Sequence, residues 1–355
     1  MQVLFFWEAV GGLGLEYRCN PYAGLLDRAL HAHDVHLCLG DYAFAKSWLE
    51  EQRPTHDVLH LNWLHGFYRR EELDATVKAY HDFAENLHVA RQLGYRIVWT
   101  LHNLYPHERP FPRVDHMARL LVADLADVVI AHCDHAAQLA RKRFYCSDVR
   151  DIPHGNFIDV YANEVTRPQA REQLQLTSEA FVYLFFGNAR SYKSIESLIE
   201  AFARLEDNDA VLGLMLRNAF DPEYGQTLIQ RAGDSDDRVR VWTSDYFANE
   251  DFQLYLNAAD VVVLPFREVL TSGSAITALG FGRPVIVPRL GCLAELVDDD
   301  VGIAYEPGQP HALERSLREI RQRDLDSLGH SARNRSESLD WAEIAREVAA
   351  AYRGE

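Results

Sequence analysis

Residues 264–288 read LPFREVLTSGSAITALGFGRPVIVP, and this stretch decides the fold class of the chain. The apolar run 261–264 predicts a strand that ends in a loop, and small residues from Gly273 onward predict a helix. Gly282 and Pro284 end that helix, and the apolar residues 285–287 predict the next strand. A strand, a loop, a helix and a second strand in this order indicate a parallel α/β sheet.

The loop before this helix also predicts a phosphate site. Backbone N–H groups at a helix start lack partners and carry partial positive charge, so they favour a bound anion. The hydroxyls of Thr271, Ser272 and Ser274 add donors, and Gly273 lets a ligand approach the backbone closely. The alternative is that Thr271 or Ser272 only caps the helix.

A second loop of the same kind follows the apolar run 181–186. It begins with Gly187 and carries Arg190 and Lys193 just where a helical pattern starts. An arginine fork and a lysine point charge together suit a diphosphate whose negative charge grows during a reaction. The alternative is two solvated surface cations.

Composition sets limits on the class of protein. A chain of 355 residues with 48% apolar and 25% charged residues predicts about two globular domains. A formal charge of −17 argues against nucleic-acid binding and gives no general attraction to an anionic membrane. No apolar stretch reaches the roughly 18 residues of a membrane span.

The five scattered cysteines lack a Cys-x-x-Cys pair, so we expect a reducing cytoplasm and no zinc site. The sixteen histidines lack ligand spacing, so we expect no other metal site.

Strand and helix patterns alternate along the whole chain. This predicts an α/β protein with two Rossmann-like, doubly wound parallel sheets that face each other across a cleft. We expect one domain over 1–160, a second over 161–335, and a C-terminal helix in 336–355 that can pack back on the first domain. The expected strands lie near 2–6, 35–39, 58–61, 96–101 and 127–131, and near 181–186, 211–216, 239–242, 260–264 and 284–287.

Ligands of such sheets bind beyond the carboxyl ends of the strands. In the first domain, the strand 96–101 ends in His102 and Asn103, with His107 close behind. A histidine there can hydrogen-bond a sugar hydroxyl or transfer a proton near neutral pH, or it can simply satisfy local backbone groups. Gly11 and Gly12, soon after the first strand, can admit a ligand or form a plain turn.

Several motifs in order resemble the GT-B glycosyltransferases, and within them the family-4-like, sugar-nucleotide-dependent enzymes. The resemblance covers nearly the whole chain. In the C-terminal half it rests on Phe186-Gly187 with Arg190-x-x-Lys193, on 257–265, on Ala278-x-x-x-Gly282-x-Pro284-Val285-Ile286 and on Gly291 through Glu295. In the N-terminal half it rests on Gly11-Gly12 and His102-Asn103.

The resemblance implies a metal-independent transferase that holds a nucleoside-diphosphate sugar, UDP- or GDP-linked, on its C-terminal domain and needs no cofactor. Arg190 and Lys193 resemble the diphosphate ligands, with Gly187, Thr271, Ser272, Gly273 and Ser274 nearby. His102 resembles the residue beside the transferred sugar, with Gly11 and Gly12 lining the cleft and Asn103 and His107 on the acceptor side. The resemblance implies a glycan or lipid-linked acceptor. Our hypothesis is surface polysaccharide or glycoconjugate synthesis in the cytoplasm, with peripheral contact at the inner face of the membrane.

One departure from the family's pattern bears on the donor site. Many family-4 enzymes carry Glu-x7-Glu, whereas this chain has Val269 and Thr277 at those two positions. Glu268 can replace the first glutamate, and Thr277 can bond a ribose hydroxyl. Retention of anomeric configuration is the expected outcome; an inverting reaction would need His102 or Glu268 as the base.

Two other functions stay open at this stage. A sugar-nucleotide isomerase or hydrolase on the same fold would turn over the donor without an acceptor. A non-catalytic sugar-nucleotide-binding subunit would bind the donor without turnover, and the missing glutamates motivate that alternative.

Overall fold

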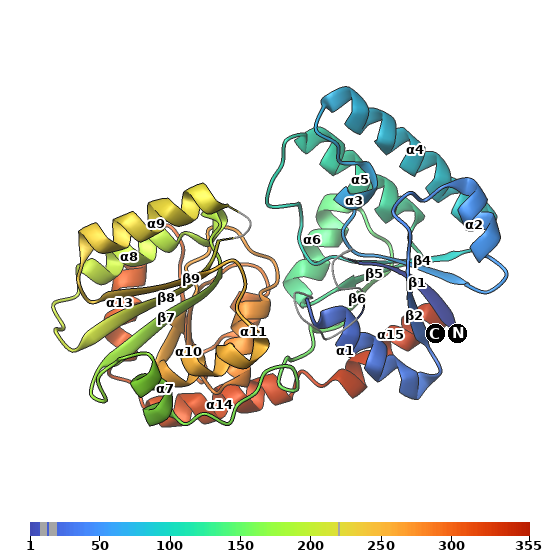
Figure 1. Cartoon of the computed structure of the whole chain (residues 1–355). Helices are drawn as coiled ribbons and strands as arrows, with labels where there is room; N and C mark the ends of the chain where they lie inside the picture. Colours follow the sequence, from blue (N-terminus) through green and yellow to red (C-terminus); the bar gives the residue numbers. More distant parts are fainter. Residues whose placement is uncertain (8–12, 14–19, 219–220) are drawn as a thin grey trace. The chain divides into compact units, whose positions relative to one another are not determined.

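The computed structural model describes residues 1–7, 13, 20–218 and 221–355. It divides the chain into two compact units (Figure 1). The N-terminal unit comprises Met1–Gly155 together with Asp340–Glu355, and the C-terminal unit comprises Asn156–Leu339. The chain thus passes between units after residue 155 and again after 339, where the sequence analysis placed the divisions after 160 and 335.

The N-terminal unit is built on one six-stranded sheet in which every pairing is parallel. The strand order is β2-β1-β3-β4-β5-β6, so the chain runs outward in both directions from β1 and β3. This is a doubly wound sheet with the flavodoxin-like order. Its strands are β1 (Gln2–Phe6), β2 (His36–Leu39), β3 (Val58–Leu61), β4 (Arg96–Thr100), β5 (Val128–Ala131) and β6 (Val149–Asp151).

Helices cover both faces of this sheet. In Figure 1, α1 and α15 lie on one face, and α3, α4 and α5 lie on the other. The C-terminal helix is therefore part of the N-terminal unit, where the buried hydroxyl of Tyr352 lies 2.6 Å from Nδ1 of His60 on β3. The helices are α1 (Tyr22–Leu30), α2 (Lys46–Gln52), α3 (His65–Tyr68), α4 (Leu73–Gln92), α5 (Pro112–Leu125), α6 (Asp134–Phe144) and α15 (Trp341–Arg353).

The C-terminal unit has a second six-stranded parallel sheet with a different order, β12-β11-β10-β7-β8-β9. Counted within the unit this is the Rossmann order, and the direction of winding reverses between β7 and β10. Its strands are β7 (Phe181–Asn188), β8 (Ala210–Arg217), β9 (Val239–Ser244), β10 (Val261–Val263), β11 (Val285–Pro288) and β12 (Gly302–Tyr305).

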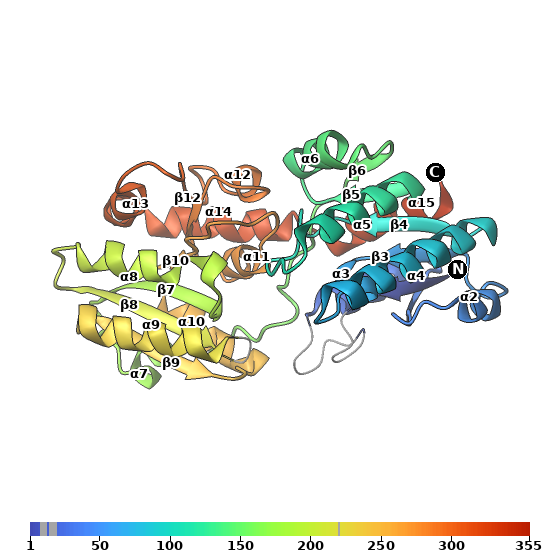
Figure 2. The same cartoon turned by 90° about the horizontal axis from the view of Figure 1, so that it is seen from above.

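Helices again lie on both faces. In Figure 2, α8 and α9 run side by side, and α10 packs with α7 and α11 with α14. The central strands carry continuous apolar runs because both faces are covered, and all three valines of β10 are fully buried. The helices are α7 (Arg167–Gln173), α8 (Ile195–Ala203), α9 (Pro222–Ser235), α10 (Phe252–Ala258), α11 (Gly273–Gly280), α12 (Leu293–Leu296), α13 (Ala312–Ile320) and α14 (Leu325–Glu337).

The structure confirms the predicted fold class of two doubly wound parallel sheets, and it corrects the number of strands. The sequence pattern predicted five strands per sheet and missed β6 and β12. Both missed strands are short and lie at a sheet edge, where fewer apolar residues are needed. Position 302 in β12 has no room for a side chain, because a Cβ on Gly302 would lie 2.0 Å from the carbonyl oxygen of Val285.

Candidate functional site

The segment that follows β7 places the ammonium of Lys193 next to the backbone of Gly187. Gly187 has φ +130°, a conformation that favours glycine, and a Cβ at this position would lie 2.6 Å from Nζ of Lys193. The same Cβ would lie 3.7 Å from Oγ of Ser274, which belongs to the first turn of α11. Lys193 and Ser274, from the segments that follow β7 and β10, therefore meet Gly187 near the end of β7, at the winding reversal of the sheet.

Lys193 is unusual for its burial. Its side chain is only 6% exposed, and its ammonium lies 5.8 Å from the ring centroids of both Phe185 and Phe266. Within the part of the chain that the structure describes, this ammonium makes no hydrogen bond or ion pair. Burial, followed by the positive charge of Arg190, lowers the pKa of Lys193 from 10.5 to about 8. A bound anion would relieve both effects.

The start of α11 is a capped helix end. Ser272 is the N-cap, and its side chain accepts a hydrogen bond from the backbone N–H of Ala275. The hydroxyl of Thr277 donates to the carbonyl oxygen of Gly273 at 2.9 Å. The capping role weighed for Ser272 is thus present, and a ribose contact from the buried Thr277 would have to compete with an existing bond.

The remaining donor-side residues surround this loop pair. Arg190 is half-buried at the start of the short turn Ser191–Lys193, and the backbone N–H of Arg267 donates to the carbonyl oxygen of Tyr192 at 2.8 Å. Thr271 is half-buried, with its hydroxyl 3.8 Å from Sγ of Cys292, and Glu268 is exposed. The structure therefore places the residues predicted after β7 and those predicted after β10 in one neighbourhood of the C-terminal unit.

In the N-terminal unit, His102 is the second residue after the end of β4, and it is 7% exposed. Its Nε2 lies 2.9 Å from Oδ1 of Asn62, and its Nδ1 lies 3.3 Å from Nε2 of His132. Trp63 stacks on the imidazole at 4.8 Å between centroids, and Tyr22 contacts its edge at 5.1 Å. Both ring nitrogens of His102 therefore already have partners inside this unit.

Burial lowers the pKa of all the imidazoles in this cluster. The pKa of His102 falls well below its ordinary value because of burial and of the neighbouring His132, His154 and His60. The pKa of His132 falls to about 4 from burial, opposed by its bond to the carbonyl oxygen of Ile152. The values for His154 and His60 fall to about 3.

Sequence reasoning missed Asn62 and His132 as partners of His102. A signal was present, since each residue comes directly after a strand, Asn62 after β3 and His132 after β5. Asn103 and His107 lie half-buried in the loop after β4. Gly11 and Gly12 fall outside the described residues, so their predicted roles stay predictions.

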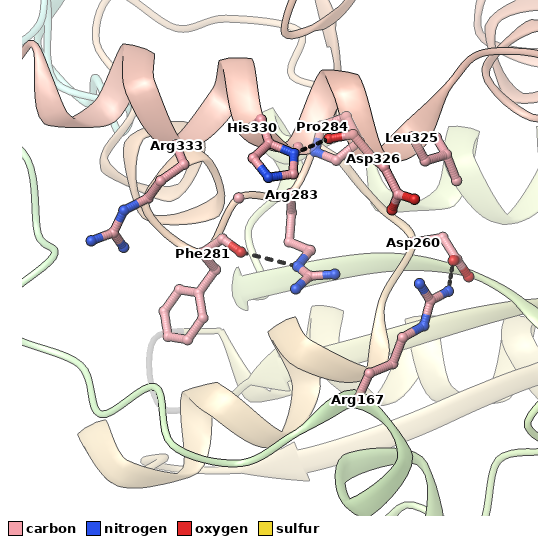
Figure 3. Close-up of a pocket in the computed structure, with 11 residues that line it drawn as sticks. Arg167, Asp260, Phe281, Arg283, Pro284, Leu325, Asp326, His330 and Arg333 are labelled. Atoms are coloured by element: carbon pink, nitrogen blue, oxygen red, sulfur yellow. Dashed lines mark hydrogen bonds and ion pairs between the residues drawn. The ribbon is translucent and has the colours of Figure 1, made fainter.

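One pocket of about 250 Å³ lies within the C-terminal unit at the opposite end of the sheet, beside the residues that precede β10 and β11 (Figure 3). It is lined by Arg167, Asp260, Phe281, Gly282, Arg283, Pro284, Leu325, Asp326, Gly329, His330 and Arg333.

The charged groups of this pocket already have partners. Figure 3 shows Arg167 directed at Asp260, with which it forms an ion pair. Arg283 donates to the carbonyl oxygens of Phe281 and Ala259, both at 3.1 Å. These bonds tie the starts of two strands to neighbouring helices, so we assign the pocket a structural role distinct from the predicted donor loops.

Among the described residues, no three histidine, cysteine or acidic side chains gather as a metal would require. None of the helices traced in 1–7, 13, 20–218 and 221–355 combines the length and the apolar character of a membrane span.

Comparisons with known proteins give the same class. Residues 180–323 match the family described as glycosyl transferases group 1. The GDP-mannose:glycolipid 4-beta-D-mannosyltransferase of Xanthomonas campestris pv. campestris is 27% identical over 251 residues, covering 69% of this chain but only 64% of that protein. The D-inositol 3-phosphate glycosyltransferase of Geodermatophilus obscurus is 26% identical over 353 residues, covering 94% of this chain and 73% of that protein.

A solved structure extends the match to the whole fold. Anabaena HepE in complex with UDP-glucose superposes with a TM-score of 0.74 at 18% identity and covers 100% of both chains. At that identity the likeness concerns the fold alone, and it defines this chain as a GT-B protein. Within that fold, residues 180–323 match the group 1 glycosyltransferases, the class that the motifs resemble, and both named relatives are glycosyltransferases.

Proposed function

We propose that this protein transfers a hexose from a UDP- or GDP-linked sugar to a hydroxyl group of a glycan or glycolipid, without a metal ion or other cofactor. The reaction would belong to the synthesis of a surface polysaccharide or glycoconjugate. The proposed location is the cytoplasm, including the inner face of the membrane.

The observation that carries this proposal is the buried ammonium of Lys193. A buried cation that follows a strand, lies over glycine backbone and makes no ion pair with any described residue is costly unless a ligand supplies the negative charge. The first turn of α11 lies beside it and offers backbone N–H groups and the Ser274 hydroxyl. A diphosphate matches this combination of a fixed cation and hydrogen-bond donors.

The chemistry follows from charge. As the bond from the anomeric carbon to the diphosphate breaks, positive charge develops on the sugar ring and negative charge on the leaving phosphate. Lys193 and Arg190 would stabilise the leaving group in place of a divalent cation. In a retaining reaction the acceptor hydroxyl can give its proton to the departing diphosphate, so no side-chain base is required.

The names of the similar proteins support the donor and acceptor classes. One relative is named for GDP-mannose and a glycolipid, and one solved neighbour holds UDP-glucose. We therefore keep both nucleotide bases as candidates and propose a lipid-linked or free glycan as acceptor.

The first experiment measures thermal stabilisation by UDP, GDP, ADP and dTDP, each with and without Mg²⁺, in the wild type and in Arg190→Ala. A ligand at 100 times its Kd adds about 2.7 kcal/mol of stability, which such a measurement resolves. The proposal expects a shift with UDP or GDP that does not need Mg²⁺ and is lost in the variant. No shift with any nucleotide would contradict the donor site.

Turnover assays then separate the rival functions. Sugar transfer only in the presence of an acceptor supports the transferase. Donor consumption without an acceptor would indicate an isomerase or hydrolase, and binding without turnover under any acceptor would indicate a non-catalytic subunit.

A further inference from the structure

The hydrogen on Nε2 of His102 follows from the orientation of Asn62. The amide nitrogen of Asn62 donates to the carbonyl oxygen of Phe6 at 3.1 Å, so the amide oxygen is the atom that faces His102. An amide oxygen can only accept a hydrogen bond. Nε2 of His102 must therefore carry a hydrogen, and in a neutral ring Nδ1 carries none.

The same reasoning applies to His132. Its Nδ1 lies 2.9 Å from the carbonyl oxygen of Ile152, which also can only accept. Nδ1 of His132 therefore carries the hydrogen of that ring, and Nε2 carries none if the ring is neutral. Two nitrogens without hydrogens, Nδ1 of His102 and Nε2 of His132, would then face each other at 3.3 Å.

We propose that one further proton, taken up from solvent, lies between these two nitrogens, so that the His102–His132 pair carries three ring hydrogens and one positive charge. His132 is then the positioning residue that fixes the orientation of His102. The catalytic consequence of this pair rests on the proposed transferase function, whereas its proton count does not.

Two effects oppose each other in the pair. Burial and the neighbouring His132, His154 and His60 lower the pKa of His102 and so disfavour a positive charge there, whereas Tyr22, which contacts both rings, adds no positive charge. The neutral alternative leaves two acceptors facing each other. Turning either ring to avoid this would leave the oxygen of Asn62 or Ile152 buried without a donor. The stacked indole of Trp63 further favours a cation in His102.

His60 provides an internal comparison. It is fully buried like the pair, but its nitrogens face two hydroxyls, those of Tyr352 at 2.6 Å and Thr100 at 2.7 Å. A hydroxyl can donate or accept, so a neutral His60 satisfies both contacts. The difference between His60 and His102 is therefore the chemistry of their partners rather than their burial.

A protonated pair changes the role of His102. With hydrogens on or shared by both of its nitrogens, His102 has no lone pair with which to accept a proton from an acceptor hydroxyl. In the proposed transferase the charged ring would be the active form of His102, and it would not be the general base.

The direct test is NMR of the full chain labelled with ¹⁵N-histidine, reading ring-nitrogen shifts near pH 7.5, where exposed histidines of pKa about 6.5 are mostly neutral. We expect an imidazolium signal from the pair and a neutral signal from His60. In His132→Asn, a neutral amide can donate to His102, so the imidazolium signal should disappear while His102 keeps its Nε2–H form. Two neutral single-tautomer signals from His102 and His132 in the wild type would overturn the proposal, and that spectrum decides even if the variant does not fold.

The pH profile of sugar transfer tests the catalytic consequence. We expect wild-type kcat to fall on the alkaline side as the pair loses its proton, and we expect His132→Asn to lack this fall. A purely structural role would lower Tm in His132→Asn and leave the shape of the profile unchanged, which would overturn the positioning role. If no donor is ever turned over, the proposed function fails, and the NMR result still decides the proton count.

Discussion

The carboxyl ends of the two sheets carry opposite kinds of polar group, although both sheets are parallel, doubly wound and six-stranded. In the N-terminal unit, His102 is stacked against an aromatic ring and both of its nitrogens have partners. In the C-terminal unit, Lys193 is buried beside glycine backbone and has no hydrogen-bond partner among the described residues. At the first edge His102 has partners within its own unit, whereas the second edge leaves the charge of Lys193 for a ligand to satisfy.

The largest effect should come from removing that charge. In Lys193→Met we expect the transfer rate to fall by roughly 10²-fold or more, because a fixed donor to the developing negative charge is lost. Steady-state kinetics with the preferred donor measures this. The control is Lys142→Met, which removes an exposed lysine of the N-terminal unit. Equal rates in the two variants would mean that the two sheet edges do not differ as described.

Filling the space over the backbone should have the next largest effect. In Gly187→Ala the new methyl group would displace the Lys193 ammonium, and we expect turnover to fall by roughly 10² or somewhat less, as for a misplacement of about 1 Å. Gly308→Ala is the matched control, because Gly308 also has positive φ (+82°) but nothing within 4 Å of an added Cβ. If both variants lose the same activity, backbone strain rather than the position of Lys193 is responsible.

The pKa of Lys193 predicts a pH dependence of donor binding. A diphosphate binds the protonated form, so affinity should fall about tenfold between neutral pH and pH 9 as Lys193 titrates near pH 8. Calorimetric titration with the bound nucleoside diphosphate measures this, and the dependence should be absent in Lys193→Met.

The unliganded protein should show the opposite trend in stability. The folded-state pKa of about 8 lies below the ordinary 10.5, so between these values the unfolded chain binds more protons. The contribution of Lys193 to the free energy of unfolding therefore rises with pH across that window. A donor affinity that stays constant up to pH 9 would show that Lys193 does not bind the diphosphate.

The smallest predicted effect concerns the N-terminal unit. In Tyr352→Phe, His60 loses a hydroxyl partner, and we expect the free energy of unfolding to fall by about 1 kcal/mol without a change in nucleotide affinity. Denaturant unfolding measures the stability. The control is Tyr145→Phe, since Tyr145 is 79% exposed. A marked loss of nucleotide binding in Tyr352→Phe would contradict the assignment of nucleotide binding to the C-terminal unit.

Much of the C-terminal unit could be predicted from local patterns. Continuous apolar runs such as 181–186 identified buried parallel strands, and the glycine and hydroxyl residues after them identified the loops around Lys193. These signals are local because a strand end and the helix after it are neighbours in sequence. The edge strands β6 and β12 escaped prediction because they are only three and four residues long, β6 has a single apolar residue, and β12 begins with a glycine.

The sequence by itself determined the class of fold, the family and the residue types at the ends of β7, β10 and β4, because alternating apolar runs and short motifs carry that information. Only the tertiary structure decided that Lys193 is buried over Gly187, that Tyr352 reaches His60, and that His102 has Asn62 and His132 as partners. Those contacts join residues that are distant in sequence, in the case of Tyr352 and His60 across almost the whole chain. They depend on the order of strands in the sheet, which no local pattern specifies.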